Sequence, residues 1–213
     1  ATTFFEIPYL EGVFCEKRFS DVHPNLSNGT VSGTASFQIE NTTGTEQEVA
    51  FALNPGYKVN SVQANGQPVP FQIDDYQESN MALLNVTIPA LESIDLCFDY
   101  HGFPQDWNLM ETMQGKPEIS SKYLCLENQA LAPAIMNAGT ADGTFSSITD
   151  ITLPDTMTVI PFGLAEAKKE AEHDNGTITW RIEDTENRGI LYAGDYVRQD
   201  IEAVGTTIQF YYG

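Results

Sequence analysis

The sequence offers few side chains that could activate water or bind a metal. Its three histidines, His23, His101 and His173, lie far apart, and none has another histidine within five residues. A zinc hydrolase commonly carries His-Glu-x-x-His on one helix face, because this spacing brings two ring nitrogens to the same ion. A site built from all three histidines is geometrically possible, but nothing in their spacing supports it. The sequence therefore predicts no metal site in this chain.

Nucleophilic catalysis has equally little support. A serine or cysteine hydrolase needs a nucleophile, a base and a group that orients the base. The sequence has no Gly-x-Ser-x-Gly motif, and neither glycine-rich phosphate motif occurs. Cys97 and Cys125 lie in apolar runs, where a thiol is more often inert than ionised. With Cys15 they allow at most one disulfide bridge, so we expect no catalytic residue here.

The charge balance excludes two classes of binding protein. The 213-residue chain has 30 acidic and 10 basic residues, for a net charge of −20. Such a surface repels phosphate backbones and anionic lipids, so we expect no nucleic-acid partner. An apolar run of about 18 residues, the length of a membrane-spanning helix, is also absent. We therefore expect no direct membrane insertion of this segment.

The acidic residues do not define a site by their spacing. Asp74-Asp75 and Asp174-Asn175-Gly176 carry oxygen atoms that calcium could use, but EF-hand spacing is absent. Asp-Asn-Gly is also typical of a tight turn, which is the interpretation we favour. Glycoside hydrolysis needs two facing carboxylates, and with 30 acids some pair always looks suitable.

The elements that position these side chains are predicted to be strands. Asn-Gly and Asp-Gly pairs recur, and they supply the positive φ angles of hairpin turns. Apolar residues alternate with polar ones, the signature of half-buried strands, in residues 32–40, 57–64, 93–100, 176–183 and 206–212. We expect about fifteen strands. The predicted fold class is all-β, a saddle- or sandwich-like domain of mostly antiparallel strands with little helix.

Two segments depart from this pattern. Residues 164–173 (LAEAKKEAEH) are rich in helix formers but lack a wide apolar stripe. Because they precede an Asn-Gly turn and a strong strand, we predict the exposed first arm of a hairpin, with a helix as the alternative. Residues 102–117 contain two prolines and no sustained period, which predicts a long connection with room for a helical turn.

The order of several motifs resembles the N-terminal β-domain of the gluzincin zinc-aminopeptidase family, the aminopeptidase N-like enzymes. The first half carries SGTASFQIENTTG, VAFALNPGYKVNSVQANGQPVPF, LLNVTIPA and IDLCFDYHGFP. The second half continues with YLCLENQALAPAI, SITDITLPDTMTVIPFG, NGTITWRIED, YAGDYV and TTIQFYYG. The resemblance spans about residues 30 to 213 and is closest to bacterial, membrane-anchored ectodomains joined to transporter-permease helices.

The resemblance implies a role that depends on a neighbouring domain. In the family, zinc binds His-Glu-x-x-His in the next, helical domain, so zinc would belong to the missing part of a parent protein. A Gln-x-Glu-type element that holds the substrate amino terminus would fall on Cys125-Leu126-Glu127. Glu127 matches the acid, whereas Cys125 replaces the amide and Leu131 stands where an aromatic precedes Pro133. The resemblance also implies a strand for residues 164–173.

We therefore expect residues 1–213 to form one accessory β-domain, not an enzyme on its own, of a larger zinc-peptidase-like protein. Its partner would be the helical catalytic-type domain of the same parent chain, on the extracytoplasmic face of a bacterial membrane. No cofactor is expected in this fragment. The alternative is an independent module that binds carbohydrate or a surface ligand. Its exposed aromatics would form a platform for sugar rings, with Trp107, Tyr76 and Tyr211 as candidates.

Overall fold

The computed structural model describes residues 7–76, 81–110, 113–163, 165–185 and 189–213. These residues form strands almost throughout, with one short 3-10 turn, η2 (Asn128–Ala130). The predicted all-β fold class is thus confirmed. The described residues divide into twenty strands, more than the fifteen expected, because several strands are only two or three residues long. Such short pieces carry too few residues to show an alternating pattern.

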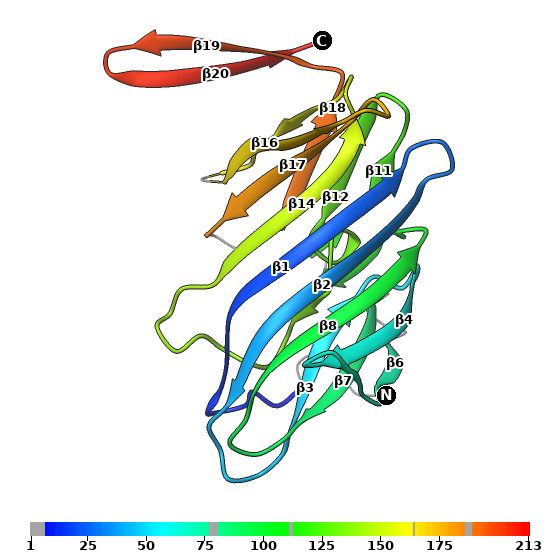
Figure 1. The fold of residues 1–213 in the computed structure, drawn as a ribbon, viewed down its shortest axis with the longest axis vertical. Coiled ribbons are helices and arrows are strands. Elements are labelled where there is room, and N and C mark those ends of the chain that lie inside the picture. The colour runs from blue at the N-terminus through cyan, green and yellow to red at the C-terminus, as the bar shows by residue number, and fades with distance from the viewer. Residues whose placement is uncertain (1–6, 77–80, 111–112, 164, 186–188) are drawn as a thin grey trace.

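An eight-stranded sheet forms the spine of the molecule (Figure 1). Its strands, in spatial order, are β16 (Glu166–His173), β17 (Thr177–Asp184), β14 (Ser146–Pro154), β1 (Val13–Asn25), β2 (Thr30–Asn41), β8 (Ser93–Gly102), β4 (Tyr57–Ala64) and β5 (Gln67–Pro68). Strands β1 and β14 pair in parallel, and the other neighbours pair antiparallel. The parallel pair joins the two halves of the sequence into one sheet.

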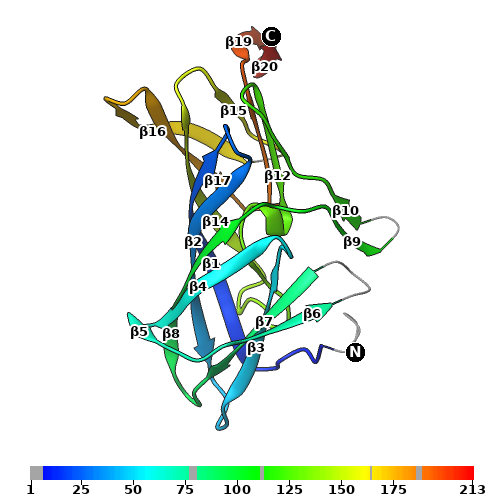
Figure 2. The ribbon, with the colours of Figure 1, turned by 90° about the vertical axis from the view of Figure 1, so that its right-hand side faces the viewer.

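Two four-stranded sheets lie on the same side of this spine (Figure 2). The first contains β13 (Ala134–Ile135), β3 (Gln47–Leu53), β7 (Met81–Ile88) and β6 (Gln72–Tyr76). The second contains β11 (Glu118–Ile119), β12 (Tyr123–Glu127), β18 (Ile190–Gly194) and β15 (Thr158–Ile160). Two hairpins complete the fold, β9 (Trp107–Met110) with β10 (Met113–Gly115), and β19 (Val197–Ala203) with β20 (Thr206–Tyr212).

An aromatic cluster joins the spine to the first small sheet. The ring of Phe51 on β3 lies 4.7 Å from that of Phe98 on β8 and 5.0 Å from that of Phe37 on β2. All three side chains are buried. Tilted and edge-on ring pairs of this kind add to the hydrophobic gain of burial. The contact makes the fold a sandwich-like arrangement with a core between its layers.

Most of the predicted alternation is confirmed by burial. The inward faces of β2, β8 and β17 are the ones that the pattern indicated, with buried Ala35, Phe37, Ile39, Ile94, Leu96, Phe98, Tyr100, Ile178, Trp180 and Ile182. The exposed strand predicted for residues 164–173 is also confirmed, since β16 pairs with β17 along its length. Its charged side chains protect an outer edge of the sheet from further pairing.

Three expectations need correction. A bulge between Val59 and Ser61 interrupts the alternation expected over residues 57–64, so that Val62 faces the core opposite Phe98. Residues 102–117 form the β9–β10 hairpin among their described residues and show no helical turn. Strand β20 alternates as predicted but is not half-buried, because it pairs only with β19.

Candidate partner-facing site around Glu127

The sheet that carries Glu127 has two different faces. Its inward face is apolar and buried against the spine, with Leu124, Leu126, Val159, Leu191 and Ala193. Its outward face, named here the outer face, carries Tyr123, Cys125 and Glu127 on β12 and Tyr192 on β18. Tyr123, Glu127 and Tyr192 are only half-buried. The alternation of β12, which the sequence shows as YLCLE, thus points every second side chain away from the core.

The Glu127 side chain is held by a hydrogen bond across the sheet. The Tyr192 hydroxyl donates to Glu127 Oε1 over 3.2 Å, although the two residues are 65 positions apart in the sequence. Burial, and the nearby Cys125 and Glu127, raise the pKa of Tyr192 to about 12. Its hydroxyl therefore stays protonated at neutral pH and remains a donor to the carboxylate. The arrangement fixes one acceptor oxygen at the end of β12.

Cys125 lies directly opposite Tyr192 in the register and is buried. Burial raises the pKa of its thiol to about 11, and the negative charge of Glu127 acts in the same direction. A thiol nucleophile needs a lowered pKa, so this environment does not favour one. Burial and the neighbouring carboxylate thus both favour the neutral thiol of Cys125. All three cysteines are free.

The chain that follows Glu127 is fixed to the spine by buried polar groups. The Tyr57 hydroxyl donates to the carbonyl of Ala130, and the Tyr100 hydroxyl donates to that of Leu131 over 2.7 Å. Arg18 Nη1 donates to the carbonyl of Pro133 over 3.4 Å. Buried carbonyls need such partners, since an unpaired one costs about 1–3 kcal/mol. The turn after β12 is thus tied to three strands of the large sheet.

Two residues of this region were missed by the sequence analysis. Arg18 is buried because a bulge after Cys15 shifts the inward face of β1, whereas strict alternation would have pointed Phe19 inward. The Gln129 side chain, on η2 beside Glu127, has a buried Oε1 with no hydrogen-bond partner among the described residues. Its place in the polar run Glu127-Asn128-Gln129 is the only signal that the sequence gives.

The aromatic candidates of the alternative function lie on strands of different sheets. Tyr76 lies on β6, Trp107 on β9 and Tyr211 on β20, which belong to three different sheets. The side chains of Tyr76 and Trp107 lie outside the described residues. The Tyr211 hydroxyl donates to Gln209 Oε1 over 3.2 Å. The binding-module alternative stays a prediction.

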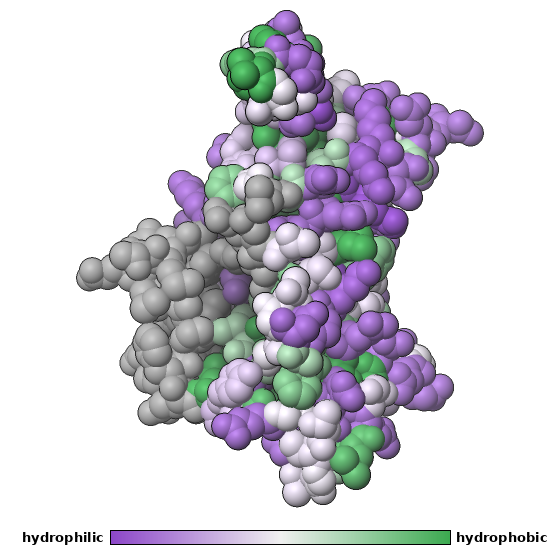
Figure 3. Space-filling model, turned by 90° about the vertical axis from the view of Figure 1, so that its left-hand side faces the viewer, coloured by the Kyte–Doolittle hydropathy of each residue, from purple (hydrophilic) through white to green (hydrophobic). Residues whose placement is uncertain are grey.

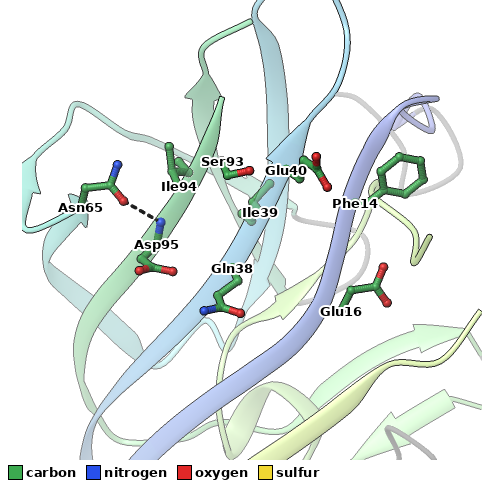
Figure 4. Close-up of a pocket in the computed structure, with 9 residues that line it drawn as sticks. All are labelled: Phe14, Glu16, Gln38, Ile39, Glu40, Asn65, Ser93, Ile94 and Asp95. Carbon is green, nitrogen blue, oxygen red and sulfur yellow. Dashed lines mark hydrogen bonds between the residues drawn. The ribbon is translucent and has the colours of Figure 1, made fainter. Parts of the chain in front are cut away.

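An open cavity of about 360 Å³ lies on the solvent-facing side of the large sheet (Figure 4). Strands β1, β2 and β8 line it with Glu16, Gln38, Glu40 and Asp95, and Asn65 Oδ1 accepts a hydrogen bond from the backbone N–H of Asp95 over 2.9 Å. The residues that line this cavity are distant in the sequence from Glu127. Its acidic lining alone assigns it no ligand.

Zinc, which the resemblance places in a neighbouring domain, has no evident site in the described ranges. They contain no group of three or more His, Cys, Asp or Glu side chains that could hold a metal ion. The residues present therefore do not fit a zinc centre. Among the same residues, no helix has the length and hydropathy needed to cross a membrane.

Comparisons with known proteins identify the fold. No protein-family model matches the chain, and no curated protein matches it either. An M1 zinc metallopeptidase from Deinococcus radiodurans superposes with a TM-score of 0.65 at 14% identity, covering 99% of this chain and 50% of that one. A two-domain M1 zinc metallopeptidase variant bound to L-arginine gives 0.64 at 13% identity, covering 96% and 48%.

Leukotriene A4 hydrolase from Saccharomyces cerevisiae gives a TM-score of 0.64 at 15% identity, covering 93% of this chain and 31% of that one. This chain therefore spans about half the length of the bacterial peptidases that it matches, and about a third of the yeast enzyme. At these identities the comparison establishes the fold. The chain folds as one domain of the M1 zinc metallopeptidases does, as its resemblance to their N-terminal β-domain predicted.

Proposed function

We propose that this chain is a non-catalytic accessory β-domain of a larger, extracytoplasmic zinc-peptidase-like protein. In that protein it packs on a helical partner domain and helps to shape the substrate cleft. The observation that carries the proposal is the match of 99% of this chain to only 50% of a zinc metallopeptidase. The described residues of this chain contain no metal-binding group. In this proposal the domain therefore contributes to catalysis through its place beside the catalytic domain.

The outer face supplies the surface for this role. Glu127 is half-buried, fixed by Tyr192 and followed by a turn that is anchored to the spine. A carboxylate on a rigid support is suited to a cationic group such as a peptide amino terminus, through a charge-assisted hydrogen bond.

The first test separates the accessory role from independent catalysis. Chain 1–213 is assayed with zinc and aminoacyl-anilide substrates, and we expect no turnover. The same assay is run on the longer polypeptide, which contains residues 1–213 together with the sequence that the gene encodes after residue 213. In this longer polypeptide we expect zinc-dependent cleavage. Zinc-dependent cleavage by chain 1–213 itself would refute the proposal, as would the absence of a downstream peptidase-like domain.

The second test addresses Glu127 in the active longer polypeptide. Glu127→Gln removes the negative charge but keeps the size and an acceptor for Tyr192. We expect KM to rise about tenfold or more with a smaller change in kcat, since a charge-assisted hydrogen bond contributes about 1.5–3 kcal/mol. Glu166→Gln, an exposed carboxylate on β16 at the edge of the large sheet, is the matched control and should leave both constants unchanged.

The location of the parent protein remains a proposal that follows from the resemblance. We propose the extracytoplasmic face of a bacterial membrane, with the parent anchored in that membrane. Protease protection of spheroplasts expressing the tagged parent checks this. Cleavage of the β-domain by protease added outside intact spheroplasts supports the proposal, and protection until lysis contradicts it.

A further inference from the structure

The C-terminal hairpin, β19 with β20, has one polar and one apolar face. Register pairs place Val197 with Tyr212 and Ile201 with Ile208 on one face, together with Phe210 opposite Gln199. The other face carries Arg198 opposite Tyr211 and Asp200 opposite Gln209. Such a separation of apolar and polar residues is typical of a sheet that has one face packed against protein and the other face in water.

The polar face is organised by its own side chains. Arg198 makes two parallel hydrogen bonds to the Asp200 carboxylate, over 2.7 and 2.8 Å. On the same face, the Thr207 hydroxyl donates to Glu202 and the Tyr211 hydroxyl donates to Gln209. These contacts join side chains of one face to one another, so that this face is suited to solvent.

The apolar face, in contrast, is not covered by the rest of the described chain. Its large side chains, Val197, Ile201, Ile208, Phe210 and Tyr212, are 43–57% exposed. The two strands form a sheet of their own and project from one end of the molecule (Figures 1 and 3), with hydrophobic residues gathered on one flank. An isolated two-stranded hairpin is marginally stable in water, and a contiguous exposed apolar patch marks an interaction surface.

The hairpin is attached to the sheet that carries Glu127. Strand β18 runs through Asp195 and Tyr196 directly into β19. The backbone N–H of Asp195 donates to the backbone carbonyl of Lys122 over 3.2 Å, and the Thr158 hydroxyl donates to the carbonyl of Tyr196 over 2.8 Å. Whatever covers the hairpin is therefore held close to the β12–β18 sheet and its outer face.

The solved structures with this fold point to one occupant. They are about twice as long as this chain or longer, and one is described as a two-domain enzyme. We propose that the apolar face of the β19–β20 hairpin is the docking surface for the downstream domain of the same polypeptide. This inference rests on the proposed function, because it requires that a partner domain exists. It adds the surface, and the five side chains, by which that domain is held.

The test compares the exposure of the same side chains in chain 1–213 and in the longer polypeptide, which contains chain 1–213 and its downstream domain. Hydroxyl-radical footprinting reads the oxidation of Phe210, Tyr211 and Tyr212 separately. We expect at least fivefold protection of Phe210 and Tyr212 in the longer polypeptide. Tyr211, on the polar face, is the internal control and should be protected less than twofold. Equal oxidation of all three residues in both proteins would overturn the docking proposal.

A pair of adjacent substitutions gives an independent reading. Ile208→Lys places a charge on the apolar face, and Gln209→Lys places the same charge on the polar face of the same strand. In chain 1–213 both variants should keep the wild-type Tm, because both positions are exposed. In the longer polypeptide, Ile208→Lys should abolish the protection and increase the radius of gyration in solution scattering. Gln209→Lys should change neither, and identical behaviour of the two variants would contradict the proposal.

The outcomes separate this inference from the proposed function. A longer polypeptide that cleaves peptides while Phe210 and Tyr212 remain exposed refutes only the docking surface. A gene that encodes no downstream domain refutes both. Protection in chain 1–213 alone that increases with protein concentration would assign the face to a second copy of this chain, and would overturn the occupant proposed here.

Discussion

The Tyr100 hydroxyl on β8 donates a 2.7 Å hydrogen bond to the carbonyl oxygen of Leu131, in the turn region that follows Glu127. The Tyr57 ring lies 5.2 Å from the Tyr100 ring, and its own hydroxyl donates to Ala130. Two tyrosines of the large sheet therefore support the segment after β12. The position of Glu127 depends on residues that are distant in the sequence and do not face the outer surface.

Tyr100→Phe tests this support. The substitution leaves the buried Leu131 carbonyl without its donor, which should lower the free energy of unfolding by about 1–3 kcal/mol. Hydrogen exchange of residues 128–133 should become faster, while exchange in β16 and β17 stays unchanged. Urea unfolding and exchange mass spectrometry measure the two effects. Tyr211→Phe on the exposed hairpin is the control, with an expected change within about 0.5 kcal/mol.

The glycine at position 56 is required by a close approach of two loops. A Cβ atom at Gly56 would meet the backbone oxygen of Phe103 at 1.7 Å, so that the backbone itself would have to move. Gly56→Ala should therefore destabilise the domain by more than about 3 kcal/mol or prevent folding. Gly44→Ala is the matched control, because nothing lies within 4 Å of the new methyl group. Equal thermal stability of the two variants would contradict this explanation.

Alkaline pH should destabilise the domain through its buried thiol and phenol groups, which are neutral in the folded protein. Burial raises the pKa of the Cys15 thiol from 9.0 to about 11, and burial also raises the pKa of Tyr57. Between pH 9 and pH 11 the unfolded chain releases the thiol proton while the folded chain retains it. This contribution to stability is complete below pH 9 and is lost as the pH rises to 11.

Urea unfolding at pH 8, 9.5 and 10.5 measures this pH dependence. Cys15→Ala should be less stable at pH 8, because it leaves a small cavity, but its stability should fall less steeply with pH. A Cys15→Ala variant with the same pH dependence as the wild type would show that the thiol does not contribute.

Arg18 and Asp184 should be energetically coupled. Arg18 is buried, and burial lowers its pKa, whereas the charge of Asp184 acts to raise it. Both residues line the same cavity, which has a volume of only about 10 Å³. Arg18→Met removes the charge that acts on Asp184 and the hydrogen bond to the buried Pro133 carbonyl, which should lower the free energy of unfolding by about 1–3 kcal/mol.

A double-mutant cycle isolates the coupling. Asp184→Asn combined with Arg18→Met should recover part of the loss, with an interaction energy of about 1–3 kcal/mol measured by urea unfolding. Strictly additive effects would mean that the two side chains stabilise the fold independently.

The sequence was sufficient for those strands whose inward faces alternate without interruption. The pattern of Ile94, Leu96, Phe98 and Tyr100 on β8 gave both the element and its buried face. It failed where one extra residue shifts the register, as between Val59 and Ser61 on β4 and between Cys15 and Arg18 on β1. A bulge changes which side chains face the core and leaves no periodic signal.

The Glu127 region was only partly predictable for a different reason. The resemblance indicated Glu127 itself, but its partner Tyr192 is 65 residues away in the sequence. The supports Arg18, Tyr57 and Tyr100 come from three other strands. Such contacts depend on which strands become neighbours, and local patterning carries no information about that. The exposure of β20 is a case of the same kind, since its alternation describes a face that no other described strand covers.

The parallel pairing of β1 with β14 has a consequence for biosynthesis. Strand β1 can pair with β2 once residues up to Asn41 have left the ribosome, but its other edge pairs with residues 146–151. More than 100 residues lie between Asn41 and the start of β14. A ribosome that adds about 5–20 residues per second needs roughly 5–20 seconds to synthesise them. During that interval the nascent chain displays an open strand edge in the middle of its future sheet. Molecular chaperones that bind such edges would act in this window, before Pro154 emerges.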